Sequence, residues 1–171
     1  MADDATMTIS AVILPDEISK TLASQTYSYA PADTSEGWYY KVVDVTTTSA
    51  DLISTETFLQ KGTTAAGVDS GSTMPAITTS DKVKFLFIKH TSVTDDGTTG
   101  NTNDSVYICI DGGTAAHDLA DAIEIGAGET WFAKFNNVTV ADIHCISGRK
   151  GGLSTGGGKI QCVVAAIIKD V

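Results

Sequence analysis

The acidic segment 94–104 holds the side chains best suited to bind a metal ion. Five hard oxygen donors lie within it: Asp95, Asp96, Asn101, Asn103 and Asp104. Carboxylate and amide oxygens are the ligands that Ca²⁺ takes in proteins. Their spacing does not follow the EF-hand pattern, in which ligands at alternate positions precede a glycine and a later glutamate. The segment is a candidate calcium loop, but we favour a solvated turn between two strands and expect no cofactor.

The histidines and cysteines form no recognisable metal or catalytic motif. His144 and Cys145 are adjacent on a predicted strand and therefore point to opposite faces. Asp142 and His144 share a face, and His90 could lie on a neighbouring strand, but a transition-metal site needs three or four converging ligands. Cysteines stand at positions 109, 145 and 162, among apolar and β-branched residues. An odd count in such surroundings predicts buried free thiols, as in a protein made in a reducing compartment.

Two glycine-rich stretches, 148–152 and 154–159, resemble a phosphate-binding loop at first sight. A P-loop ends in Gly-Lys-Ser/Thr and opens a helix. Here Gly158-Lys159 is followed by Ile160 and a predicted strand, which indicates a flexible loop between two strands. There is no Gly-x-Ser-x-Gly elbow for a nucleophilic serine, and nothing marks a pair of carboxylates for glycoside hydrolysis. The sequence therefore predicts a protein that is not an enzyme.

Composition and charge narrow the class of protein. The chain has 171 residues, of which 42% are hydrophobic, and 21 Asp+Glu against 11 Lys+Arg give a net charge of −10. Such an apolar share predicts one folded domain. Arg149 is the only arginine, whereas a nucleic-acid binder needs clustered cations. The longest apolar run, 162–168, is too short to span a bilayer, and the acidic N-terminus does not resemble a secretory signal. We therefore expect neither a nucleic-acid partner nor a membrane partner.

The elements that position these side chains are predicted to be strands. Runs rich in Val, Ile, Thr and aromatic residues alternate with Gly, Asp and Asn, as is typical of sheets and their turns. Only 16–22 has the start signals of a short helix. The predicted strands span residues 8–14, 38–46, 52–60, 82–90, 105–111, 122–125, 130–135, 138–147 and 159–169.

Several of these strands alternate between two faces. Val106 and Ile108 face one way and Tyr107 and Cys109 the other, as period-2 geometry requires. The run 160–168 is apolar almost throughout, which predicts a central strand covered on both faces. About nine strands without crossover helices predict an all-β, antiparallel jelly-roll β-sandwich, with an immunoglobulin-like sandwich as the second choice. We expect this domain at residues 37–171, with residues 1–36 as an N-terminal arm or extension.

Aromatic residues are densest at Trp38-Tyr39-Tyr40. Such rings form carbohydrate-binding platforms in some proteins. Alternating rings also pack into a sandwich core or a protein interface, where large aromatic residues contribute much of the buried area. We favour packing or an interface for this cluster.

From Lys82 onward, the order of segments resembles small virion proteins of tailed bacteriophages, in particular jelly-roll capsid decoration (cement) proteins. The segments are the strand 82–91, a strand ending in Asp111-Gly112-Gly113, the hairpin at 126–129 and the closing apolar strand. The resemblance implies a homotrimer that binds the major capsid protein on the capsid exterior and stabilises the shell. Such a protein is made in the host bacterial cytoplasm. An N-terminal or loop segment often contacts the shell in these families, and the matching candidates here are Ile13, Leu14, Tyr27, Tyr29 and Trp38.

Two other functions remain open at this stage. A receptor- or glycan-binding knob on a phage fibre or head would share the fold and bind host polysaccharide through exposed aromatic residues. A small cupin-like enzyme would need converging histidine and carboxylate ligands, which the sequence does not reveal.

Overall fold

A computed structural model of the chain describes residues 5–12, 22–29, 36–55, 60–61, 76–94, 104–117, 122–149 and 159–171. These residues form strands and one short 3₁₀ helix. The elements are β1 (Ala5–Val12), β2 (Leu22–Tyr29), β3 (Glu36–Val45), β4 (Ala50–Asp51), β5 (Gln60–Lys61), β6 (Lys82–Thr94), β7 (Ser105–Cys109), β8 (Ile123–Ile125), β9 (Thr130–Thr139), η2 (Val140–Asp142), β10 (His144–Gly148) and β11 (Ile160–Lys169).

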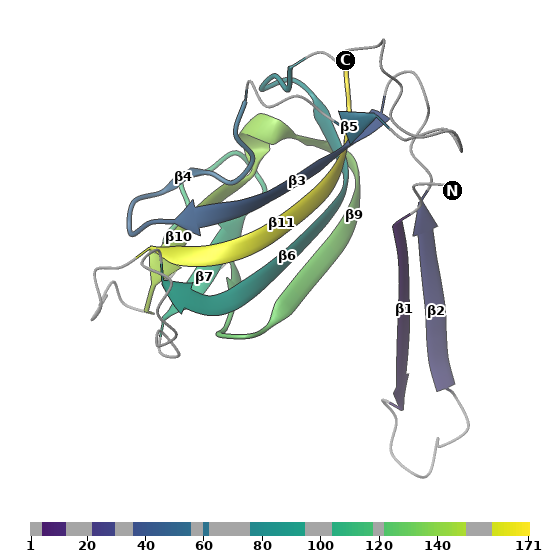
Figure 1. Cartoon of the computed structure of the whole chain (residues 1–171), viewed down its shortest axis with the longest axis horizontal. Coiled ribbons are helices and arrows are strands. Elements are labelled where there is room, and N and C mark those ends of the chain that lie inside the picture. The colour runs from purple at the N-terminus through teal and green to yellow at the C-terminus, as the bar shows by residue number, and fades with distance from the viewer. Residues whose placement is uncertain are drawn as a thin grey trace.

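Two antiparallel sheets form a β-sandwich (Figure 1). The larger sheet has the strand order β5-β3-β11-β6-β9, and the smaller has the order β4-β10-β7-β8. The main strands pair in a nested way along the chain: β7 with β8, β6 with β9, β4 with β10, and β3 with β11. The first and last strands of the sandwich are therefore neighbours at the centre of the larger sheet.

The core lies between the two sheets because each strand turns its apolar face inward. Leu86 and Ile88 from β6 and Val164 from β11 are fully buried there, together with Ile108 from β7 and Ile143. Each such side chain contributes about 1.5–3 kcal/mol to the free energy of folding when it leaves water. The prediction of a central strand at 160–168 is confirmed, since β11 pairs with β3 on one side and β6 on the other.

Several predicted boundaries were wrong. The segment 52–60 was expected to be one strand, but residues 52–55 are bends and turns after the short β4, and β5 begins only at Gln60. The single strand predicted for 138–147 is interrupted by η2, where the backbone turns the corner from one sheet to the other. Leu22, expected at the end of a helix, begins β2. The rest of that helix segment, 16–21, lies outside the described residues.

β1 and β2 form a sheet of their own, paired in register from Ala5↔Tyr29 to Val12↔Leu22. In Figure 1 they appear as a separate ribbon beside the sandwich. The sequence predicted a strand at 8–14 but not the partner strand at 22–29, because Ser and Thr alternate there with few β-branched apolar residues.

Candidate interaction surface

The outer face of the larger sheet, turned away from the core, is mostly apolar. Strand register sets its side chains in three rows that run across β3, β11, β6 and β9. Nine of the twelve residues are apolar, and five are aromatic. We call this set the outer face; its rows are Trp38–Ile167–Phe85–Lys134, Tyr40–Ala165–Phe87–Phe132 and Val42–Val163–Lys89–Thr130.

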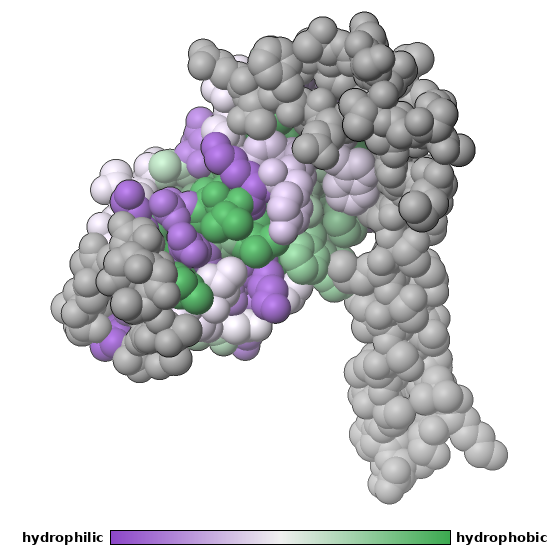
Figure 2. Space-filling model, viewed as in Figure 1, coloured by the Kyte–Doolittle hydropathy of each residue, from purple (hydrophilic) through white to green (hydrophobic). Residues whose placement is uncertain are grey.

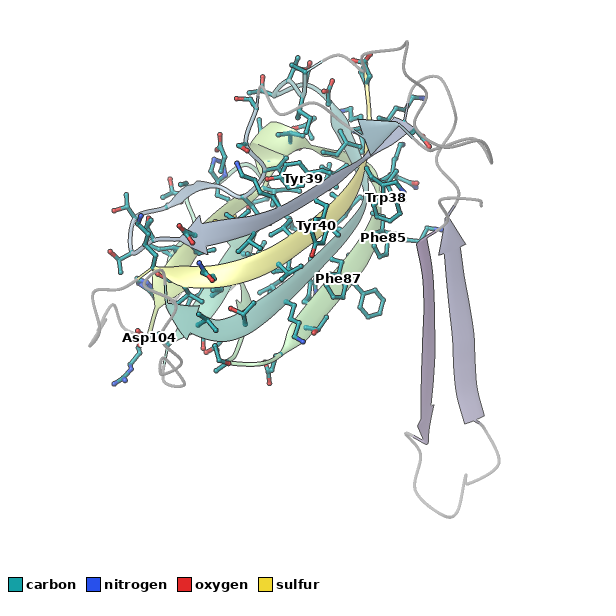
Figure 3. All side chains as sticks on the ribbon, viewed as in Figure 1. Trp38, Tyr39, Tyr40, Phe85, Phe87 and Asp104 are labelled. Atoms are coloured by element: carbon teal, nitrogen blue, oxygen red, sulfur yellow. The ribbon has the colours of Figure 1, made fainter. Side chains whose placement is uncertain are left out.

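The exposure of the side chains differs between the rows of the outer face. Ile167 and Phe85 are 0% and 6% exposed, whereas Tyr40 is 67% and Val42 48% exposed. Figure 2 shows hydrophobic residues gathered over this sheet with hydrophilic residues beside them. Figure 3 shows Trp38, Tyr40, Phe85 and Phe87 spread along it. Apolar patches exposed on a protein surface mark interaction sites, and Tyr40 and Val42 are the exposed large apolar residues of this face.

Strand alternation divides the Trp38-Tyr39-Tyr40 cluster between two environments. Tyr39 points into the core and is 1% exposed, and its hydroxyl has no hydrogen-bond partner among the described residues. Trp38 is half-buried on the outer face, next to the exposed Tyr40. Both interpretations favoured for this cluster, core packing and a surface for contact, are therefore compatible with its geometry.

The candidate calcium loop is described only at Asp104. Its carboxylate is 3% exposed and accepts a hydrogen bond from Nε of Arg149 at 2.9 Å. Residues 95–103, with the other four candidate ligands, lie outside the described residues. Among the residues that the structure describes, no three His, Cys, Asp or Glu side chains gather as a metal site would require.

His90 is a fully buried structural residue. Its Nδ1 accepts a hydrogen bond from the backbone N–H of Ser92 at 3.0 Å, so Nε2 carries the proton and donates to the backbone oxygen of Asp104 at 3.1 Å. A bulge in β6 makes this possible, because Ser92 has a φ of +62° and the β6–β11 register shifts there. The hydroxyl of Thr91 fixes the bulge by donating to the backbone oxygen of Gln161 at 2.7 Å.

We expect His90 to make the fold less stable as the pH falls below about 6.5. Burial lowers the pKa of His90 from its ordinary value of 6.5, and the opposing effects of Asp104 and Glu129 are smaller. Below pH 6.5 the unfolded chain binds a proton that the folded chain does not, so stability present above this pH is lost as the pH falls. Urea unfolding at pH 7.5 and 5.5 measures the loss.

The matched variant is His90→Gln, which keeps a hydrogen-bonding side chain but cannot titrate. Its stability should be lower overall and should change less between pH 7.5 and 5.5. A hydrogen bond from the backbone N–H of Thr139 lowers the pKa of the Asp142 carboxyl group, and this contribution to stability is lost only at more acidic pH. An unchanged pH dependence in the variant would show that His90 is not the group responsible.

His117 links a loop to the smaller sheet. Its Nε2 lies 2.8 Å from the backbone oxygen of Ser147, and its ring packs edge-on against Tyr107, with centroids 5.5 Å apart. Gly148, with a φ of +150°, lies directly beneath the ring. A Cβ at position 148 would overlap the imidazole, so the glycine is required both by its backbone conformation and by the close approach.

The structure does not bring His90 together with Asp142 and His144, a grouping that the sequence left open but did not favour. Asp142 lies in η2, where it accepts from the backbone N–H of Thr139 at 2.7 Å. Nε2 of His144 lies 3.2 Å from the carboxylate of Asp51 on the neighbouring β4. His90 belongs to the other sheet. The opposite orientation of His144 and Cys145 is confirmed, because Cys145 is buried in the core and His144 is half-buried.

All three cysteines are buried and free, as predicted. Cys145 and Cys162 lie in the core between the sheets, where burial raises the pKa of each thiol to about 12. Cys109 lies on the other side of the smaller sheet and donates to the carboxylate of Asp111 at 2.7 Å. Thiols so protonated and covered are poor nucleophiles.

The predicted contact residues are only partly described. Ile13 and Leu14 lie outside the described residues, as does the glycine-rich segment 150–158. Tyr27 and Tyr29 are placed by the backbone register of β2, and Trp38 lies on the outer face. The aromatic cluster at 38–40 indicated an interface in this region, but the sequence did not identify Phe85, Phe87 and Phe132 as part of the same surface. Their alternation is visible in the sequence, but the joining of three distant strands is not.

Comparisons with protein-family models, with curated proteins and with solved structures found no match to this chain. In the part of the chain that the structure describes, no helix has the length and apolar character needed to cross a membrane.

Proposed function

We propose that this chain is a capsid decoration protein of a tailed bacteriophage, a homotrimer that binds the outside of the shell and stabilises it. The observation that carries the proposal is the outer face, an apolar sheet face on which Tyr40 and Val42 are exposed. Small-molecule sites are concave, whereas an open sheet face suits attachment to another protein surface. The resemblance of the segments from Lys82 onward to capsid decoration proteins indicates the partner, which would be the major capsid protein or a second copy of the chain.

The strand order supports the jelly-roll part of this proposal. A jelly roll is an eight-stranded double sheet, which forms when a ribbon of four nested strand pairs is rolled up. With β5 set aside as an added edge strand, the eight sandwich strands from β3 to β11 pair first with eighth, second with seventh, third with sixth and fourth with fifth. Successive nested pairs lie alternately in the larger and the smaller sheet, which is the arrangement that rolling up such a ribbon produces.

Electron microscopy of the virion tests the proposed location. We expect density for three copies of the chain on the capsid exterior, around three-fold or quasi-three-fold axes. Repetition around these axes would add avidity to weak single contacts. Density confined to the tail would contradict the proposal.

Binding to isolated capsids tests the role of the outer face. Tyr40→Lys places a charge at the most exposed aromatic residue of this face and should reduce co-sedimentation with capsids at least tenfold. Thr47→Lys adds the same charge in an exposed turn outside the outer face and should bind as the unaltered protein does. Equal binding by both variants would show that the outer face contributes to capsid attachment neither by direct contact nor by forming the trimer.

A glycan-binding knob is the second candidate, and the exposed ring of Tyr40 beside Trp38 favours it. Sugar rings stack on exposed aromatic faces, so a knob would bind host polysaccharide or lipopolysaccharide. Binding of these polymers to the purified protein, lost in Tyr40→Ala, combined with tail-confined density, would establish this function instead.

A further inference from the structure

The smaller sheet carries a second apolar cluster, on the side that faces away from the sandwich core. Its buried members are Tyr107, Cys109, Ala115 and Ile146. Ala115 belongs to residues 111–117, which follow β7 and which we call the strap. The strap lies outside every strand and helix of the structure, and Ala115 is its one buried residue. The strap therefore covers part of the sheet while burying little of itself.

The strap lies directly against the side chain of Cys109. The thiol donates a hydrogen bond to Oδ1 of Asp111 at 2.7 Å. The position that a Cβ of Gly113 would take is 3.5 Å from the same sulfur, so the backbone of the strap passes close to the thiol. Cys109 is 1% exposed. Displacement of the strap would therefore uncover this thiol.

Hydrogen bonds join the strap to neighbouring segments near its start, in its middle and at its end. They run from the N–H of Gly112 to the backbone oxygen of Asp142 at 3.0 Å, from the N–H of Ala115 to Oγ of Ser49 at 2.9 Å, and from Nε2 of His117 to the backbone oxygen of Ser147 at 2.8 Å. The sheet beneath is held differently, because β7 and β10 share a ladder and turn their other faces into the main core.

We propose that the strap opens and closes on an intact sandwich, and that this motion uncovers Tyr107, Cys109 and Ile146 together. Segments with few buried apolar contacts open at a lower free energy than the core does. Gly112 provides a pivot at the start of the strap, because its φ of +83° lies in a region that glycine enters without strain. This inference goes beyond the decoration role and does not depend on it.

His117 is the latch of the strap. Its ring packs edge-on against Tyr107 of β7, and its Nε2 bonds to the backbone oxygen of Ser147 of β10. One side chain of the strap thus contacts both strands beneath it. Removal of this side chain should shift the strap toward its open state.

Opening of the strap would restore the reactivity of Cys109. Burial raises the pKa of this thiol, and its hydrogen bond to Asp111 raises it further; both effects are lost when the strap leaves. Cys145 and Cys162 lie between the two sheets, so their exposure requires the sheets to separate. The three cysteines therefore distinguish opening of the strap from unfolding of the sandwich.

Labelling of the unaltered chain with a small maleimide tests the proposal. The reagent is kept at low concentration, without denaturant, so that each rate reports the equilibrium between the closed and the open state, and mass spectrometry assigns the labelled thiols. We expect Cys109 to react at least 100-fold faster than Cys145 and Cys162. In low urea, only the two slower rates should rise steeply, because global unfolding exposes much more surface than opening of the strap. Equal rates at all three thiols would overturn the inference.

A substitution in the main core separates the two motions. Ile88→Ala should raise the labelling rates of Cys145 and Cys162 at least tenfold, because it weakens the contact between the sheets. The rate of Cys109 should stay within twofold, since the closed and the open state keep the same core. Val164→Ala, a milder change in the same core, should give the same pattern. Equal acceleration of all three thiols would show that Cys109 reacts only through global unfolding, and would overturn the inference.

Substitutions at the strap contacts provide the complementary measurement. His117→Ala should raise the rate of Cys109 at least tenfold. Ser49→Ala removes the acceptor of the Ala115 N–H and should also raise this rate. Thr48→Ala is the matched control in the same turn, because Thr48 uses its backbone in the described hydrogen bonds there, and it should leave the rate unchanged. A rate of Cys109 that His117→Ala does not change would overturn the inference.

Discussion

Ile88→Ala should lower the free energy of unfolding by about 2–5 kcal/mol, the usual cost of truncating a fully buried isoleucine and leaving a cavity. Ile88 lies on β6 between the two sheets and is 0% exposed. For a chain of this size the loss corresponds to a fall in melting temperature of about 5–15 °C. Urea unfolding followed by tryptophan fluorescence measures the change, since Trp131 packs against the same core.

Two neighbouring valines on β11 provide the matched control. Val164 points into the core and is 0% exposed, whereas Val163 is half-buried on the outer face. Val164→Ala should cost about 2–3 kcal/mol, from two buried methyl groups and the space they leave. Val163→Ala should cost less than about 1 kcal/mol in the monomer. If the outer face is an interface between copies, any further loss of stability caused by Val163→Ala will depend on protein concentration. Equal costs for the two variants at high dilution would contradict the assignment of the faces.

Gly148→Ala should strongly destabilise the fold, because the added Cβ would overlap the ring of His117. We expect a loss of about 2–4 kcal/mol, from backbone strain of about 1–3 kcal/mol and the loss of about one hydrogen bond. The φ of +150° is unfavourable for alanine, and the new Cβ would displace His117 from the backbone oxygen of Ser147. Thermal unfolding measures the loss.

A double-mutant cycle separates the two contributions. His117→Ala removes the ring that the new methyl group would strike. In the Gly148→Ala/His117→Ala protein the combined cost should therefore be smaller than the sum of the single costs, by at least about 1 kcal/mol. Purely additive costs would mean that backbone strain alone accounts for the effect and that the ring makes way freely.

The local pattern of the sequence was sufficient to predict the strands and the division of their faces. Val106 and Ile108 face the core and Tyr107 and Cys109 face the other way, as predicted, and all three cysteines are buried. The predicted ends of strands were wrong where tertiary contacts determine them. η2 interrupts a β-branched run because the chain must pass between sheets there, and β2 forms in a Ser/Thr-rich segment because β1 lies beside it.

The candidate sites could be predicted only where they depend on residues close together in the sequence. The opposite orientations of His144 and Cys145 follow from their adjacency. The role of His90 does not, because its partners Ser92 and Asp104 meet only after β6 bulges and the chain returns at the start of β7. His117 reaches the backbone of Ser147 across 30 positions. No local pattern encodes such contacts, because they depend on the pairing of β7 with β10.

The sequence by itself determined that the chain is built of amphipathic strands, that it carries excess acid, and that its thiols are buried. Alternation, composition and residue type are properties of neighbours along the chain, so they can be read locally. The tertiary structure alone decided that Trp38, Tyr40, Phe85, Phe87 and Phe132 share one surface. These aromatic residues lie on β3, β6 and β9, far apart in the chain. They form one surface because β11, the last strand, inserts between β3 and β6 and sets the register of both.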